Sequence, residues 1–357
     1  MKQVHNFSAG PGILPKDVLE QASNACLDFD GLGLSLLEIS HRSKNFERVM
    51  DASRELVKTL LNVGSDYEVL FLGGGASLQF GMVPLNLLSE TGVAAYVNTG
   101  VWSTKAIAEA QRVGKVEVIA SSEAERFSYI PSGYSIPERA DYLHITSNNT
   151  IYGTQFQNFP ECSIPLVCDM SSDIFSRPIN ASAFDLIYAG AQKNMGPAGC
   201  TMVLVKKHVV GKTGRKLLSM LDYQVHIKGG SMYNTPPVFP IYVSYLTLSW
   251  LKAQGGIAWI DALNQKKADL LYAEIDRNTL FTGTARNDSR SRMNVCFLLQ
   301  QQQLESTFDN LCKEAGISGI RGHRDVGGYR ASLYNALPVS SVQALIDVMQ
   351  HLENQFA

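Results

Sequence analysis

Several kinds of protein are excluded by what this 357-residue sequence does not contain. Its six cysteines form no C-x-x-C pair and no histidine lies at a metal-ligand spacing, so we expect reduced thiols and no metal site. No apolar run approaches the length of a membrane span, and the first twelve residues lack the basic start and apolar stretch of a signal peptide. The sequence therefore predicts a cytoplasmic protein without a membrane partner.

An excess of charge of either sign is also missing. Lysine and arginine number 31 against 33 aspartates and glutamates, a net charge of −2, so the composition does not favour a nucleic-acid or anionic-membrane partner. Hydrophobic residues make up 45% and charged residues 18% of the chain, which is ordinary for a globular enzyme. Any anionic ligand must then be bound by a local group of basic residues.

The first two thirds of the chain alternate between short apolar runs and helical patterns. Strands alternating with helices indicate an α/β fold with a mostly parallel sheet of the seven-stranded type, flanked by helices. The predicted strands are residues 68–72, 93–97, 116–120, 142–146, 166–169, 184–188 and 200–205, and helices are predicted at 78–88 and 102–113.

A different pattern begins near residue 260. A helix at 262–277, strands at 293–299 and 329–334 and a final helix from 341 predict a smaller α+β unit at the C-terminus. We expect a large cofactor-binding domain at 16–260, a small domain at 261–357, and an N-terminal segment, 1–15, packed on the small domain. No linker rich in proline, glycine or serine marks the boundary.

A lysine lies between two of the predicted strands, 184–188 and 200–205. The segment between them holds three glycines and a proline, which interrupt regular structure and let the backbone approach a ligand. Lys193 thus follows the carboxyl end of a strand, the edge at which open α/β sheets bind ligands. We expect Lys193 to hold a cofactor covalently as an imine.

Three glycines followed by Ala76 and Ser77 separate a predicted strand from a predicted helix. Free backbone N–H groups and the positive end of the helix dipole would bind a phosphate there. The segment matches neither the dinucleotide fingerprint nor the P-loop, and a plain tight turn explains it equally well.

Three further polar or aromatic residues follow strands. Asp169 ends an apolar strand, where a carboxylate is costly unless a cation meets it; a helix cap is the alternative role. Trp102 offers a flat face and Thr150 a hydroxyl, although a core tryptophan and a polar turn explain them as well.

Together these groups are what pyridoxal 5'-phosphate requires: a phosphate cradle, a stacking face, a carboxylate for the ring nitrogen and a lysine amine. The cofactor ring accepts the electrons freed when a Cα–H bond breaks. Because a free lysine with a pKa of about 10.4 is a poor base at neutral pH, we expect the site to lower the pKa of Lys193.

Nearly end to end, the chain resembles the phosphoserine aminotransferases, which are class V, fold-type-I pyridoxal-phosphate enzymes. The matching stretches are residues 6–11, 31–42, 73–86, 169–178, 188–199, 230–237 and 322–336. The resemblance implies catalysis by Lys193 and Asp169. It also implies further cofactor contacts from Ala76, Ser77, Trp102, Thr150 and Gln192, and contacts from Asn234 and Thr235 to the phosphate of a neighbouring subunit. A homodimer with shared active sites follows from that last implication.

Substrate recognition is implied for the basic residues. Arg330 matches the arginine that binds the α-carboxylate, because a planar guanidinium can bind it through two bonds. The distal anion is assigned by resemblance to His41, Arg42, His323 and Arg324, for which ordinary surface charges are the alternative. Two positions depart from the family: many bacterial relatives have arginine where this chain has Ser77, and some have serine where it has Ala9.

The reaction implied is transamination between L-glutamate and 3-phosphohydroxypyruvate, which gives O-phospho-L-serine and 2-oxoglutarate in serine biosynthesis. In bacteria the family also aminates a phosphorylated four-carbon 2-oxo acid in pyridoxine biosynthesis. The alternatives are another class V reaction, such as a different aminotransfer or cysteine desulfuration, and a binding protein that has lost catalysis. None of the six cysteines lies in a segment of the mobile, glycine-rich type that a desulfurase needs.

Overall fold

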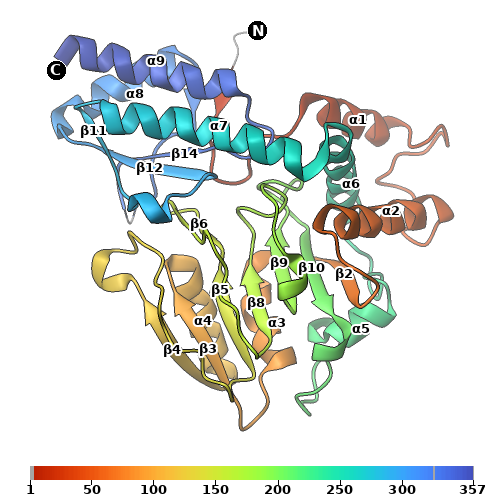
Figure 1. Ribbon diagram of the computed structural model, residues 1–357. Coiled ribbons are helices and arrows are strands. Elements are labelled where there is room, and N and C mark those ends of the chain that lie inside the picture. The colour runs from red at the N-terminus through yellow and green to blue at the C-terminus, as the bar shows by residue number, and fades with distance from the viewer. Residues whose placement is uncertain (1–3, 325, 357) are drawn as a thin grey trace.

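The computed structural model describes residues 4–324 and 326–356, and a seven-stranded sheet runs through the larger part of these residues (Figure 1). The strand order is β2-β10-β9-β8-β5-β3-β4, and only β10 runs antiparallel to its neighbours. The strands are β2 Tyr67–Leu72, β3 Val93–Asn98, β4 Lys115–Ser121, β5 Tyr142–Thr146, β8 Leu166–Asp169, β9 Leu186–Gly190 and β10 Thr201–Lys206. The predicted α/β fold with a mostly parallel sheet is confirmed.

Both faces of the central strands β5, β8 and β9 are buried, which explains why these strands read as continuous apolar runs, whereas the edge strand β4 is largely exposed. Side chains alternate between the faces with a period of two. Met202 and Leu204 of β10 pack in one hydrophobic cluster, whereas Val203 and Val205 pack in the cluster on the other face.

Helices cover each face (Figure 1). One cluster is closed by the buried sides of α2 and α6, which pack against each other, and the other by α3 and α4. The helices of this part are α1 Lys16–Leu27, α2 Lys44–Leu61, α3 Gly75–Leu87, α4 Val101–Val113, α5 Tyr223–Lys228 and α6 Val238–Ala253. A small hairpin, β6 Asn148–Asn149 with β7 Thr154–Gln155, follows β5.

A second layer, turquoise to blue in Figure 1, lies above the carboxyl ends of the parallel strands. Its antiparallel sheet has the order β11-β12-β14, and its hydrophobic cluster is separate from those of the large sheet. The elements are α7 Gly256–Arg277, β11 Phe281–Gly283, β12 Asn294–Leu299, α8 Glu305–Glu314, β13 Ile317–Ser318, β14 Tyr329–Ser332 and α9 Val339–Phe356.

The N-terminal segment belongs to this second layer. Strand β1, His5–Asn6, pairs in parallel with β13, and Phe7 is fully buried in the cluster of the C-terminal elements. These contacts agree with an N-terminal segment packed on the C-terminal unit. The boundaries predicted for the domains, 16–260 and 261–357, remain a prediction.

Two helices differ from the sequence expectations. Helix α7 begins at Gly256 rather than residue 262, after Gly255 and Gly256 take left-handed backbone angles of φ 116° and 70°. Helix α3 begins at Gly75 rather than residue 78, so part of the predicted glycine loop forms its first turn. Gly75 was expected in the loop that precedes the helix and instead lies at its start.

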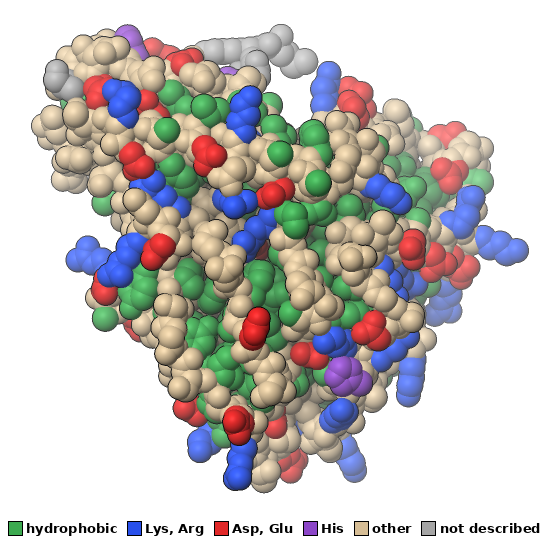
Figure 2. All heavy atoms as spheres, in the orientation of Figure 1, with side chains coloured by type: hydrophobic (Ala, Val, Ile, Leu, Met, Phe, Trp, Pro, Cys, Tyr) green, Lys and Arg blue, Asp and Glu red, His purple; other side chains and the backbone are tan. Residues whose placement is uncertain are grey.

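No helix among the described residues is both long and apolar enough to cross a membrane. On the face shown in Figure 2, basic and acidic side chains are interspersed and no large area carries one sign of charge.

Candidate active site

Lys193 lies in a cavity of about 310 Å³ at the carboxyl ends of the central strands. The wall includes residues that follow β5, β8, β9 and β2, and Arg330 and His323 come from the C-terminal unit. It is lined by Ala9, Gly10, Gly75, Ala76, Ser77, Trp102, Thr146, Asn148, Thr150, Ile151, Asp169, Ser171, Ser172, Gln192, Lys193, His323 and Arg330.

The loop that carries Lys193 is fixed at both ends. The N–H groups of Lys193, Met195 and Gly196 all donate to the carbonyl of Ala191, which forms a tight turn after β9. Gly196 packs so closely on α6 that a Cβ atom there would lie 2.4 Å from the Ser244 hydroxyl oxygen. The turn therefore holds the lysine in one position.

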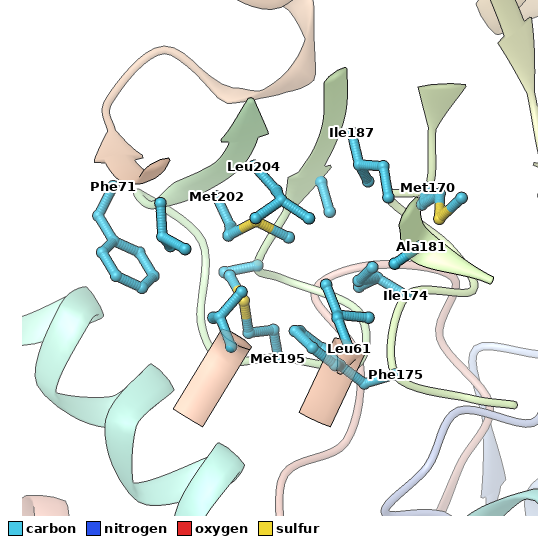
Figure 3. Packing of buried hydrophobic residues seen from close by; sticks show 14 of the residues in the cluster. Leu61, Phe71, Met170, Ile174, Phe175, Ala181, Ile187, Met195, Met202 and Leu204 are labelled. Carbon is cyan, nitrogen blue, oxygen red and sulfur yellow. The ribbon is translucent and has the colours of Figure 1, made fainter. Parts of the chain in front are cut away.

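The loops after β8 and β9 share one anchor in the core. Met195 follows Lys193, and Ile174 and Phe175 follow Asp169 in the chain; all three are buried in the same cluster (Figure 3). Because the cluster fixes both loops, Lys193 and Asp169 keep a constant relation to each other.

The amine of Lys193 has two close neighbours in the cavity. Its Nζ donates to Thr150 Oγ1 at 2.9 Å and lies 5.9 Å from the centre of the Trp102 ring. Burial and the positive charge of Arg330 lower the pKa of Lys193 and the negative charge of Asp169 raises it; together they bring the pKa to about 8. The lowered pKa expected from the sequence is thus present in the structure.

Asp169 is a buried carboxylate at the end of β8. Burial raises its pKa, and this is opposed by a hydrogen bond of 2.9 Å from the backbone N–H of Ser171 and by the charge of Lys193. A carboxylate in such a place is stabilised by a further cation in the cavity. The protonated nitrogen of a ring ligand would supply that cation.

The first turn of α3 forms one end of the cavity. Gly74 caps this thirteen-residue helix with a left-handed backbone, and Gly75, Ala76 and Ser77 follow with N–H groups at its positive end. A Cβ atom built on Gly73 or Gly75 would meet no atom within 4 Å, so there is open space at the helix start. Backbone N–H groups beside open space make a site for an anion such as phosphate.

Comparison with known proteins identifies the family of this chain. Residues 4–345 match the family model described as aminotransferase class-V. The phosphoserine aminotransferase of Flavobacterium psychrophilum is 61% identical over 98% of this chain and 99% of its own. The chain is a member of the phosphoserine aminotransferase family.

Solved structures of the family have the same fold. The phosphoserine aminotransferase from Bacillus circulans subsp. alkalophilus is 43% identical, with a TM-score of 0.97 and coverage of 99% of both chains. A pyridoxal-phosphate-bound phosphoserine aminotransferase from Trichomonas vaginalis is 35% identical, with a TM-score of 0.93 over 98% of this chain and 100% of that one. The fold-type-I architecture expected from the resemblance is therefore confirmed.

As in other phosphoserine aminotransferases, the cofactor is pyridoxal 5'-phosphate, and the cavity fits it. The cradle at α3 suits its phosphate, Asp169 its ring nitrogen and Lys193 its aldehyde. The indole nitrogen of Trp102 and the hydroxyl of Thr146 are buried without a partner, which leaves two polar atoms at the wall of a site built for a polar ligand. Among the described residues, no group of three or more histidine, cysteine or acidic side chains could hold a metal ion.

Some residues expected from the sequence do not line this cavity. Asn234 and Thr235 are exposed beside a second cavity, of about 450 Å³, whose wall includes Gly73, Gly74 and Leu78. The remaining residues of this kind are His41, Arg42 and Arg324; Arg42 and Arg324 are exposed, and His41 is half-buried. Their roles remain predictions, because the site within one chain does not include them.

Other wall residues were not expected. Thr146 is the last residue of β5, Asn148 lies two residues after it, and Ser171 and Ser172 lie within three residues of the end of β8, so the rule that ligands bind at strand ends would have found them. Gly10 has no such signal, because it reaches the cavity from the N-terminal segment.

Proposed function

We propose that the protein transfers the amino group of L-glutamate to 3-phosphohydroxypyruvate, which yields O-phospho-L-serine and 2-oxoglutarate. One observation carries the proposal: a single cavity holds an amine of lowered pKa, a buried carboxylate, a helix N-terminus and an arginine. Membership of the phosphoserine aminotransferase family supports the same reaction.

When bound, pyridoxal phosphate supplies an electron sink next to the carbon that gains or loses the amino group. Lys193 would hold the cofactor and then move the proton at Cα, for which an amine of pKa about 8 is suited at neutral pH. Asp169 would keep the ring nitrogen protonated. Thr150, Trp102 and Gln192 would orient the ring, and the N–H groups of Ala76 and Ser77 would bind its phosphate.

We assign the α-carboxylate that both substrates carry to Arg330. Its Nη1 donates to the backbone carbonyl of Thr150 at 3.4 Å, so the guanidinium lies beside the residue that also contacts Lys193. The Arg330 Nε is buried without a hydrogen-bond partner. A donor left unpaired at the cavity wall would gain a partner from a substrate carboxylate.

A group of basic residues is assigned to the distal anion of the substrate. His323 lines the cavity, whereas His41 and Arg42 lie before α2 and away from it. We assign the active form to a homodimer in which His41, Arg42, Arg324, Asn234 and Thr235 complete the cavity of either subunit. The exposed position of Asn234 and Thr235 beside Gly73 and Gly74 supports this assignment, since this edge is next to the phosphate cradle.

No observation favours cysteine desulfuration. The six cysteines are Cys26 and Cys162, which are half-buried, and Cys168, Cys200, Cys296 and Cys312, which are buried; none lines the cavity. The four-carbon acid of pyridoxine biosynthesis and the cytoplasmic location remain predictions.

Two measurements test the proposal. When protein loaded with the cofactor is reduced with borohydride, the cofactor should become permanently attached, as a label, to the peptide that contains Lys193. Lys193→Ala should bind the cofactor without labelling or turnover. Lys207→Ala, which removes an ion-paired lysine at the opposite edge of the sheet, is the control and should behave as the unmodified protein. Label on another lysine, or turnover by Lys193→Ala, would contradict the assigned chemistry.

The substrate is tested by comparing acceptors. With glutamate as donor, kcat/KM for phosphohydroxypyruvate should exceed that for hydroxypyruvate by at least ~10-fold, the ratio expected from one charge-assisted hydrogen bond to phosphate. Equal values would exclude a pocket for the distal anion.

A further inference from the structure

A chain of buried hydrogen bonds joins the cofactor cavity to the C-terminal unit. Asn148, in the cavity wall, donates from Nδ2 to Asn294 Oδ1 at 2.8 Å. Asn294, on β12, in turn donates to the Tyr334 hydroxyl at 3.4 Å, and that hydroxyl donates to the carbonyl of Ala9 at 2.6 Å. The chain thus begins at one wall of the cavity and returns to another.

Each amide in this chain uses both of its ends. Asn148 also donates to Ser172 Oγ at 2.8 Å and accepts a bond from the Ser291 hydroxyl, while Asn294 also donates to Ser332 Oγ at 3.0 Å. These residues are at most 2% exposed. Buried amides that are fully paired favour one arrangement of the elements they join, because a shifted arrangement would leave polar groups unpaired.

The direction from donor to acceptor is fixed for every hydrogen bond in this series. Burial raises the pKa of the Tyr334 phenol, so it stays protonated and donates its one proton to Ala9. The phenol oxygen then can only accept from Asn294, whose own oxygen accepts from Asn148. Removing one member would therefore affect the bonds on both sides of it.

Tyr334, the last side chain in this series of hydrogen bonds, holds the N-terminal segment against the loop that carries Lys193. Ala9 and Gly10 line the cavity, and the N–H of Gly12 donates to the carbonyl of Gln192 at 2.7 Å. Gly12 lies against the Tyr334 ring, since a Cβ atom there would be 2.7 Å from the ring atom Cδ2. Tyr334 thus holds this rim of the cavity through both its ring and its hydroxyl.

Asn294, in the middle of this series of hydrogen bonds, fixes the position of β14, the strand that carries Arg330. Strand β12 pairs with β14 so that Asn294 lies opposite Ser332 and Cys296 opposite Arg330. The bonds of Asn294 to Asn148 and Ser332 therefore fix the height of Arg330 above the cofactor wall.

We propose that Asn294 and Tyr334 are positioning residues that hold Arg330 and the Ala9–Gly10 rim at a set distance from the cofactor, and so determine the affinity for the substrate carboxylate. The proposal rests on the transamination proposed above. Neither side chain lines the cavity, so both act through the residues they hold.

Tyr334→Phe tests the end of the chain, because it removes one hydroxyl and keeps the ring that packs on Gly12. The KM values for glutamate and phosphohydroxypyruvate should rise ~3- to 10-fold, the range that corresponds to one neutral hydrogen bond, while kcat and the cofactor dissociation constant change less than ~2-fold. The backbone amides of residues 7–13 should also exchange with deuterium faster. The control is Tyr67→Phe, in which a buried tyrosine that donates to a backbone carbonyl at 2.7 Å is altered at the opposite edge of the sheet.

Asn294→Ala tests whether the residues act as one chain. If they do, the double variant with Tyr334→Phe should raise KM by little more than Asn294→Ala alone, whereas independent effects would multiply. Multiplied effects, an unchanged KM, a loss of kcat at constant KM, or an equal change in Tyr67→Phe would overturn the proposal. A protein that does not use glutamate would instead refute the transamination, and the exchange measurement would still decide whether Tyr334 holds the N-terminal segment.

Discussion

The amine of Lys193 donates a hydrogen bond of 2.9 Å to the hydroxyl of Thr150. The carbonyl of the same threonine accepts a bond from Arg330 Nη1, so Thr150 lies between the two cationic groups. Burial and Arg330 both lower the pKa of Lys193, to about 8. A neutral amine is therefore readily available near physiological pH, as covalent attachment of an aldehyde requires.

Thr150→Val should lower the pKa of Lys193 in the cofactor-free protein below 8. The hydroxyl accepts a bond from the ammonium and thus favours the charged form, so its loss favours the neutral amine. The rate at which cofactor-free protein develops the yellow colour of the bound cofactor should rise with pH through this pKa. Its midpoint is then expected at lower pH in Thr150→Val, and Thr150→Ser, which keeps the hydroxyl, should retain the original midpoint. A midpoint that moves upward in the valine variant would show that the hydroxyl does not stabilise the ammonium.

Asp169→Asn should weaken binding of the cofactor. The carboxylate is buried and its pKa is raised by that burial, so it gains most from a protonated ring nitrogen, which an amide cannot replace. Loss of one charge-assisted bond predicts a dissociation constant ~10- to 150-fold higher, with turnover reduced by at least that factor. Quenching of tryptophan fluorescence on titrating cofactor into the apoprotein measures this without any assay of activity. Asp141→Asn, at the opposite edge of the sheet, should leave the constant unchanged; equal constants for Asp169→Asn and the unmodified protein would contradict the role of Asp169.

Sequence patterns predict this site well where local order places a residue at a strand end. Lys193 and Asp169 follow short apolar runs, and because parallel strands end at one edge, two positions far apart in the chain could be expected to meet. Thr150 and Trp102 also follow predicted strands, and Arg330 was expected from the resemblance; all three line the same cavity. The same reasoning failed at one helix start, since Gly75, expected in the loop before the helix, lies in its first turn.

Contacts between segments that are far apart in the chain could not be predicted from the sequence. Nothing near Ala9 or Gly10 indicates that the N-terminal segment reaches the Lys193 loop, because the hydrogen bonds that place it come from Gln192 and Tyr334. The pairing of Asn148 with Asn294 likewise joins residues 146 positions apart. In the sequence, nothing distinguishes Asn148 or Asn294 from other polar residues. Only the packed fold buries them and pairs one with the other.

Lys267→Met should change stability in a way that depends on pH. Lys267 is fully buried and donates to the carbonyls of Leu333 at 2.9 Å and Tyr334 at 2.8 Å, and burial lowers its pKa to about 7. Between pH 7 and the ordinary lysine pKa near 10.4, the unfolded chain binds a proton that the folded protein does not, so stability from this group rises with pH. Below pH 7 both states are protonated and the contribution is constant.

The measurement is the free energy of unfolding by denaturant from pH 6 to 9.5. The free energy of unfolding of the unmodified protein minus that of Lys267→Met should be constant below pH 7. Above pH 7 this difference should increase by at most ~1.4 kcal/mol per pH unit. Lys266→Met, which alters the exposed neighbour on α7, should give a constant difference. A difference that stays constant up to pH 9.5 would show that the folded protein retains the proton as the unfolded chain does, and would contradict the lowered pKa of Lys267.

Mixing two inactive variants tests whether active sites are shared between subunits. Lys193→Ala lacks the reactive amine, and Asn234→Asp should repel the cofactor phosphate if Asn234 reaches a neighbouring cradle. A hybrid dimer then contains one site with both defects and one intact site, so co-refolding equal amounts should restore up to about a quarter of the original activity. Sites built within single chains would stay inactive in every combination, because no hybrid could bring an intact Lys193 and an intact Asn234 together. Because Asn234 is exposed and lies outside the cavity of its own chain, we expect restoration.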